Sequence, residues 1–141
     1  MELFTGADEA EVARREKIAP KILLQEWLEE FLKRKDITRL SDGSYNVEGL
    51  VNLANLKLTK LPLKFNHVSG SFWCEKNQLT TLEGAPKSVG RDFWCYDNQL
   101  TSLEGAPRVV GAYFYCRNNK KKFTHADVGA VCGFVKGAVY V

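Results

Sequence analysis

Cysteine and histidine are the residues of this chain that could bind a metal ion or attack a substrate. Cys74, Cys95 and Cys116 recur at intervals of 21 residues. A zinc site needs ligands paired at short spacing, and the chain has neither a CxxC pair nor paired histidines. His67 and His125 fall in other phases of the 21-residue interval. We therefore expect no metal site, because a column of small buried thiols explains the cysteines better.

Catalysis has no better support in the residue pattern. A nucleophile needs a base within hydrogen-bond reach and a third group that orients the base. Neither histidine shares the phase of the cysteines, and the repeated acids Glu83 and Glu104 are copies of one turn position. The glycines also fall at turns and form no phosphate-binding GxGxxG or GxxxxGK[ST] loop. We expect neither an enzyme nor a bound cofactor.

The elements that position these residues come from an internal repeat with a period of 21 residues. Three segments align without gaps from Val51, Phe72 and Phe93, and a fourth begins at Phe114 and stops. Five apolar columns keep this phase: Val51/Phe72/Phe93/Phe114, Leu53/Cys74/Cys95/Cys116, Leu58/Leu79/Leu100, Leu61/Leu82/Leu103 and Val68/Val89/Val110. One unit cannot bury its own apolar face, so the units are expected to stack into a solenoid with a parallel sheet.

Each repeat begins like a strand and ends at a turn. Phe93 and Cys95 alternate with Trp94, which places the tryptophan on the opposite face of the sheet. The segment Gly105–Pro107 then supplies turn residues. One polar column also keeps the period: Asn77, Asn98 and Asn119. We expect these side chains to point inward and to hydrogen-bond the backbone of neighbouring turns.

The segments on either side of the repeat are predicted to cap the solenoid. Residues 7–18 and Pro20–Lys35 are expected to be helical, and residues 44–47 a strand or hairpin. The apolar stripe of the second helix is predicted to consist of Leu24, Trp27, Leu28, Phe31 and Leu32. At the other end, Thr124 and Asp127 have the spacing of a capping box before a short helix, and residues 138–141 suit a final strand.

These predictions give one structural domain in three parts. Residues 1–50 form an N-terminal helical and hairpin cap, residues 51–119 the leucine-rich repeats, and residues 120–141 a C-terminal cap. The expected fold class is therefore α+β: a small leucine-rich-repeat solenoid with a parallel sheet, an N-terminal helical cap and a C-terminal helix and strand cap.

The repeat also resembles known families. The pattern FxCxxNxLxxL followed by ExAP is similar to the short bacterial leucine-rich repeat, LxVxxNxLxxLPxLP. The phrases NQLTSLEGAP, GLVNLANLKLTKLPLKF and NNKKKFTHADV…VKGAVYV resemble a family of repeat proteins from tailed bacteriophages, over roughly residues 37–141. This resemblance implies a capped solenoid that serves as a binding scaffold. It implies little about activity.

A candidate partner-binding surface lies on the outward side of the repeated strands. In-register strands lie about 4.8 Å apart, so Trp73, Trp94 and Tyr115 should form an aromatic ladder that meets solvent. The residues expected to widen or edge it are Tyr96, Tyr113, Glu75 and Arg117. Exposed aromatic residues with charges beside them are typical of interface hot spots. The alternative is that the ladder only stabilises the sheet through contacts between neighbouring strands.

The expected function is that of a non-catalytic protein-binding module. With 20 basic and 17 acidic residues the surface is mixed in charge. The charged N-terminus resembles no signal peptide and no apolar run could cross a bilayer, so a cytoplasmic location without membrane contact is expected. If the phage resemblance holds, the chain would be an accessory protein in the host bacterial cytoplasm that inhibits a host or defence protein by occlusion.

Two alternatives from other classes remain open. In the first, the ladder stacks the bases of single-stranded nucleic acid while Arg117, Lys76 and the lysines at 120–122 meet phosphates. Glu75 and Asp92 on the same face argue against this, so nucleic acid is the less expected partner. In the second, the chain is a structural component that forms a homo-oligomer through the same patch.

Overall fold

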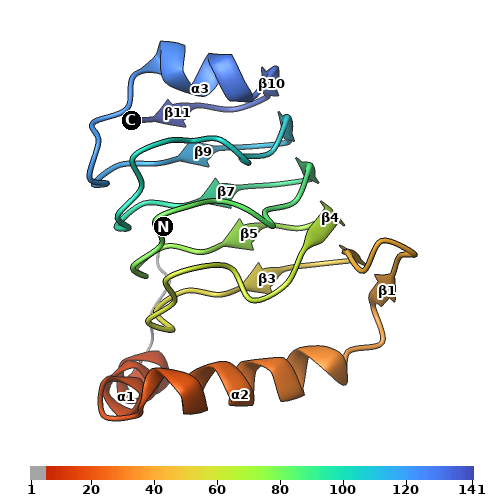
Figure 1. The fold of residues 1–141 in the computed structure, drawn as a ribbon, viewed down its shortest axis with the longest axis vertical. Helices are drawn as coiled ribbons and strands as arrows, with labels where there is room; N and C mark the ends of the chain where they lie inside the picture. Colours follow the sequence, from red (N-terminus) through yellow and green to blue (C-terminus); the bar gives the residue numbers. More distant parts are fainter. Residues whose placement is uncertain (1–5) are drawn as a thin grey trace.

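The structure is a computed structural model that describes residues 6–141. It is an α+β fold in which a parallel β-solenoid is closed by helices at both ends, with the coils stacked along the long axis (Figure 1). At one end lie α1 (Gly6–Glu16) and α2 (Pro20–Leu32), and at the other end lies α3 (His125–Val131). Among these described helices, none combines the length and hydrophobicity needed to cross a membrane.

Two sheets form the walls of the solenoid. The five-stranded sheet contains β3 (Val51–Asn52), β5 (Phe72–Trp73), β7 (Phe93–Trp94), β9 (Phe114–Tyr115) and β11 (Val139–Tyr140). The six-stranded sheet contains β1 (Ile37–Arg39), β2 (Tyr45–Val47), β4 (Phe65–Val68), β6 (Ser88–Val89), β8 (Val109–Val110) and β10 (Phe134–Val135). All neighbouring strands are parallel except the β1–β2 hairpin.

The strand register follows the 21-residue period of the sequence. Phe72 pairs with Phe93 and Phe93 with Phe114, as the alignment of the repeats predicts. The column of Val68, Val89 and Val110, predicted only as apolar, forms the second sheet. Three of its six strands have only two residues, too few for an alternating pattern to reveal them in the sequence.

The core lies between the two sheets and consists of the predicted columns. Phe72, Phe93 and Phe114 are fully buried, with ring centroids 5.9 Å and 5.3 Å apart between successive coils. The thiols of the cysteine column are buried beside them. Burying each large apolar side chain contributes about 1.5–3 kcal/mol, so stacking the coils supplies the stability that no single coil could have.

The asparagine column crosslinks the coils as predicted. Asn98 Oδ1 accepts a hydrogen bond from the Leu79 backbone N–H at 3.0 Å. Its amide nitrogen donates to the carbonyl oxygens of Cys74 and Cys95 at 3.0 and 3.1 Å. Asn77 and Asn119 make the corresponding bonds in their own coils. These side chains satisfy backbone groups that the two-residue strands leave buried without partners.

The N-terminal helices close the first coil. Trp27 of α2 donates from its indole nitrogen to the Asn52 carbonyl at 2.8 Å, which satisfies a group on the free edge of β3. The buried face of α2 differs from the predicted stripe, because Leu23 and Phe31 are buried whereas Leu32 is 55% exposed. The stripe was predicted from spacing alone, but a helix lying across a solenoid end buries only the residues that meet the coil.

The C-terminal cap agrees with its predicted elements. Thr124 and Asp127 form the capping box at the start of α3, with the Thr124 hydroxyl accepting from the Asp127 N–H and the Asp127 carboxylate accepting from the Thr124 N–H. The last strand, β11, pairs with β9. Between α3 and β11 in the sequence the chain forms β10, which pairs with β8 in the six-stranded sheet. This strand was not expected from the sequence.

The asparagine column generates a stability prediction. Asn98→Ala leaves the buried Leu79 N–H without its acceptor and removes the donors to the carbonyls of the adjacent strands. We expect the free energy of unfolding to fall by about 3 kcal/mol, since each buried unsatisfied group costs about 1–3 kcal/mol. Urea denaturation measures this change. The control is Gln99→Ala at the exposed neighbouring position, and equal stability of the two variants would contradict a structural role for the asparagine column.

Candidate interaction surface

The outward side of the five-stranded sheet carries two columns of aligned side chains. The first column contains Asn52, Trp73, Trp94, Tyr115 and Tyr140, which are paired in register. The second contains Ala54, Glu75, Tyr96 and Arg117 at the 21-residue period. Because the preceding phenylalanines and the following cysteines point inward, these residues must point outward. We call this surface, together with Tyr113, the aromatic face.

The predicted aromatic ladder is present and longer than expected. The indole rings of Trp73 and Trp94 stack with centroids 4.5 Å apart and an interplanar angle of 8°. Tyr115 lies 4.7 Å from Tyr96 and 4.9 Å from Tyr140 by the same measure. Sequence reasoning missed Tyr140 because it belongs to the C-terminal cap and falls outside the repeat period, although its strand was predicted. The face is therefore one connected layer of rings.

The prediction that both indoles meet solvent is wrong for Trp94. This side chain is only 3% exposed, although it lies on the outward side of the sheet and Phe93 and Cys95 are buried on the inner side as predicted. Trp94 is the central rung, stacked on Trp73 and beside Tyr96, and paired in register with Tyr115. Neighbouring rings thus take up the space that solvent would occupy. Trp73 and Tyr115 are partly exposed, and Tyr113 is 46% exposed.

Glu75 is a buried acid on this face rather than the surface charge predicted from its position. It is 3% exposed, and its Oε1 atom has no hydrogen-bond partner. Burial raises the pKa of Glu75 to about 7; its own backbone N–H and the charge of Lys76 act in the opposite direction, and Asp97 adds to the rise. The Trp73 indole nitrogen is likewise buried without an acceptor. Two polar groups on one face are thus unsatisfied in this structure.

The other charged residues of the face have partners. Arg117 is exposed, with its guanidinium 5.7 Å from the Tyr115 ring centre and 5.6 Å from that of Tyr140. Asp92 accepts a hydrogen bond from the Tyr113 N–H at 2.9 Å. Asp97 accepts one from the Asn118 side chain at 2.7 Å. The structure therefore brings all seven predicted site residues onto one face, and two of them, Trp73 and Glu75, each keep a buried polar atom without a hydrogen-bond partner.

The cysteine column is structural in its geometry. Burial raises the pKa of Cys74 and Cys95 well above the ordinary value, so these thiols are poor nucleophiles. The Cys74 thiol donates to the Trp94 carbonyl at 3.2 Å. Among residues 6–141, no group of three or more His, Cys, Asp or Glu side chains is placed to hold a metal ion.

A serine and histidine pair on the six-stranded sheet was missed by sequence reasoning. His67 Nδ1 lies 2.6 Å from Ser88 Oγ, because the two residues are paired in register on β4 and β6. The 21-residue spacing between them was the available signal. In the described part of the chain no acidic side chain hydrogen-bonds the other ring nitrogen, so the pair lacks the third member of a catalytic triad.

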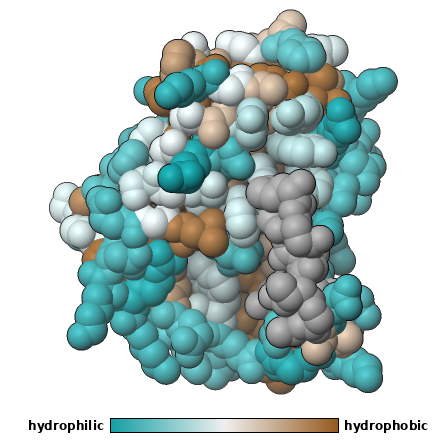
Figure 2. Space-filling model, turned by 180° about the vertical axis from the view of Figure 1, so that it is seen from behind, coloured by the Kyte–Doolittle hydropathy of each residue, from teal (hydrophilic) through white to brown (hydrophobic). Residues whose placement is uncertain are grey.

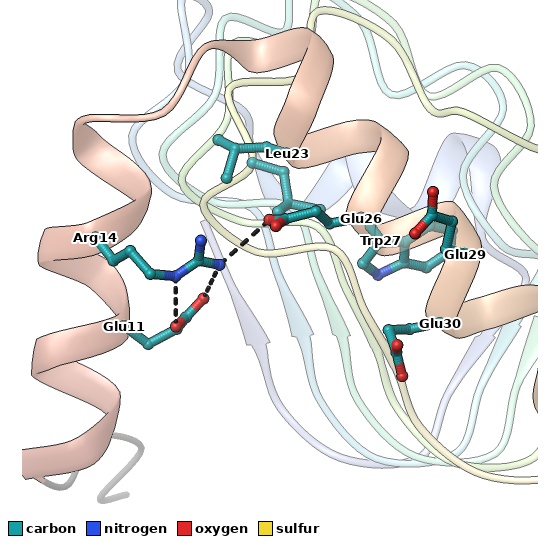
Figure 3. Close-up of a pocket in the computed structure, with 8 residues that line it drawn as sticks. Glu11, Arg14, Leu23, Glu26, Trp27, Glu29 and Glu30 are labelled. Carbon is teal, nitrogen blue, oxygen red and sulfur yellow. Dashed lines mark hydrogen bonds and ion pairs between the residues drawn. The ribbon is translucent and has the colours of Figure 1, made fainter.

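A cleft of about 420 Å³ lies between α1 and α2. Figure 3 shows Arg14 between Glu11 and Glu26, and the ion pairs have N–O distances of 2.8 and 3.2 Å. Glu29, Glu30 and Trp27 also line it. Among the described residues that line the cleft there is no Ser, Thr, Cys or His, and Arg14, the one cation among them, already bridges two of the acids. Its geometry ties the two helices together.

The hydropathy of the surface is uneven. Seen from behind, hydrophobic residues gather mainly at the end that carries α3 and β10, whereas the end formed by α1 and α2 is largely hydrophilic (Figure 2). Val109 and Phe134, which are 44% and 55% exposed, belong to strands β8 and β10 at that apolar end. These two side chains add apolar area to this part of the surface.

The buried acid generates a prediction about stability and pH. The unfolded chain ionises Glu75 above the ordinary pKa of 4.5, whereas the folded protein keeps the proton to about pH 7. The folded state therefore binds more protons in this window, and stability falls as the pH rises through it. The loss is on the order of 3 kcal/mol and stays constant above the folded pKa. The Glu75→Gln variant has no carboxyl group at this position, so it should not lose this stability as the pH rises.

We expect Glu75→Gln to gain stability relative to wild type by about 2–3 kcal/mol on going from pH 4.5 to pH 8. Urea denaturation at several pH values measures this difference. Glu104→Gln, at an exposed turn position, is the matched control and should keep the wild-type pH dependence. A parallel response of the Glu75→Gln variant and the wild type would show that Glu75 is not a buried acid.

Comparisons with known proteins assign the chain to no family. No protein-family model matches it, and neither a curated protein nor a solved structure gives a significant match. The resemblance to repeat proteins of tailed bacteriophages therefore stays a prediction, and any function must be inferred from the geometry of the chain itself.

Proposed function

We propose that this chain is a non-catalytic protein-binding module that holds its partner on the aromatic face. The observation that carries this proposal is the connected layer of two tryptophans and four tyrosines on one outward sheet surface, with Arg117 exposed beside it. Tryptophan, tyrosine and arginine dominate the energetics of protein interfaces, because they supply large contact areas and keep a polar group for orientation.

The rigidity of the strands that carry the aromatic face also favours binding. The rings project from strands that are crosslinked by backbone hydrogen bonds and by the asparagine column, so they are held in place before a partner arrives. A preorganised surface loses little conformational entropy on binding. A ladder that served only to stabilise the sheet would not require Tyr113, which is 46% exposed.

Binding of single-stranded nucleic acid is less well supported. A row of bases needs a row of exposed rings, but the central ring, Trp94, is only 3% exposed and is stacked 4.5 Å from Trp73. The partly exposed acid Asp92 would also repel phosphates. Self-association through the same face is the other alternative, and light scattering over a range of concentrations tests it.

The biological setting follows from the sequence resemblance alone. If the chain belongs with the repeat proteins of tailed bacteriophages, it acts in the cytoplasm of the infected bacterium. A small binding module without catalytic groups would inhibit a host or defence protein by covering its working surface. By this analogy the partner is a bacterial protein.

The test is a pull-down from bacterial lysate with the double variant Tyr113→Ala/Arg117→Ala. Both side chains are exposed, so the fold should survive their removal. We expect recovery of the specific partner to fall by about tenfold or more, as for truncation of hot-spot residues. Phe134→Ala is the control, since Phe134 is an exposed aromatic residue of the other sheet. If the double variant recovers every specific partner as well as wild type does, the aromatic face is not the binding site.

A further inference from the structure

The aromatic face has a step between its first and second coils. Asn52 pairs in register with Trp73, and Ala54 occupies the column of Glu75, so two small residues are followed by two large ones. The Asn52 side chain turns back to accept a hydrogen bond from the Ala54 N–H at 3.0 Å. It is therefore held to its own backbone and not across the indole.

The side of Trp73 that faces β3 borders this step, because Asn52 is its neighbour in register. The opposite ring face is covered by Trp94, whose centroid lies 4.5 Å away at an interplanar angle of 8°. On the side of β3 the neighbour in register is Asn52, which has no ring to stack. The step thus has an aromatic wall of the kind that a planar or rod-shaped side chain stacks against.

The two unsatisfied polar atoms of the face belong to the same wall. The Trp73 indole nitrogen is a donor without an acceptor, and Glu75 Oε1 is an acceptor without a donor. Each buried unsatisfied group is costly, so a face that keeps two of them, on residues two apart along the chain, is suited to a ligand that supplies both partners. That ligand must offer a hydrogen-bond donor to the carboxylate and an acceptor to the indole.

A basic side chain on a peptide backbone meets these requirements. Its cation pairs with a carboxylate and lies on the free face of an indole, and the carbonyl of the peptide accepts from the indole N–H. Arginine fits better than lysine, because its planar guanidinium both stacks and donates two parallel hydrogen bonds to a carboxylate. Both atoms lie below the surface, which favours a long and slender side chain over a flat contact.

We propose that the step beside Trp73 and Glu75 receives an arginine side chain from the protein partner. The inference rests on the proposed function and names the chemistry of that partner. The charged groups around Glu75 are Lys76 and Asp97, of opposite sign, so they leave the carboxylate available as the main charge for the incoming cation. Binding involves rearrangement of the side chains that now shield the two atoms.

The experiment uses the full chain and a displayed library of random 12-residue peptides. Selected peptides are synthesised with each arginine replaced in turn by citrulline, which keeps the shape and removes the charge. For wild-type protein, one such replacement should weaken binding by about tenfold or more. For Glu75→Gln the same replacement should have little effect, because the carboxylate is already absent. Glu104→Gln should behave like wild type.

A second variant tests the step without altering the acid. Ala54→Phe places a ring where the arginine is expected, so binding of the selected peptides should be lost while the melting temperature stays close to that of wild type. Peptides that depend on Tyr113 and Arg117 but contain no essential arginine would overturn this inference and leave the proposed function standing. If the selected peptides bind every variant of the aromatic face as tightly as wild type, both this inference and the proposed function are wrong. If no peptide can be selected, that result counts against the inference.

Discussion

Hydrogen bonding between successive coils of the repeat at a constant offset is the constraint on which the rest of this structure depends. The Phe72 N–H donates to the carbonyl of Asp92, and the Phe93 N–H to that of Tyr113, both at 2.9 Å. Because the offset is the same from β3 to β9, a residue type that recurs every 21 positions meets its own copy in the next coil. The offset differs only in the cap strands, where the Phe114 N–H donates to the carbonyl of Ala138. The asparagine column maintains the offset where the strands end, since its amides bond backbone groups of two coils at once.

The same constraint gives the two faces of the sheet different properties. Inside, phenylalanine and cysteine columns fill the space between the sheets, and the described polar groups there are satisfied. Outside, the register forces indole against indole and leaves Glu75 among rings, where it has no partner for one carboxylate oxygen. The register that aligns the core residues therefore also aligns the outward residues, and it gathers the aromatic rings and the unsatisfied acid on one outward surface. The core explains the stability of the fold, and the outward surface carries the functional proposal.

Particular residues show where reasoning from the sequence succeeded and where it failed. The inward asparagines were predictable, because a polar residue repeated among apolar columns needs a local partner. The capping box at Thr124 was predictable from spacing. The burial of Trp94 was not, since alternation along a strand tells which side a residue faces and not how closely its neighbours cover it. The pair of His67 and Ser88 was missed because the short second sheet leaves no alternating pattern.

The sequence by itself determined the period, the inward columns, the capped ends and the identity of the side chains on the outward face. Those follow from local rules, namely alternation in strands, turn residues and the need of a small unit to bury its apolar side by stacking. Only the tertiary structure decided which outward residues meet water, that Tyr140 extends the ladder, and that Glu75 lies buried with one carboxylate oxygen unpartnered. Solvent exposure and the pKa of an acid depend on atoms supplied by other coils, and no one-dimensional pattern records their distances.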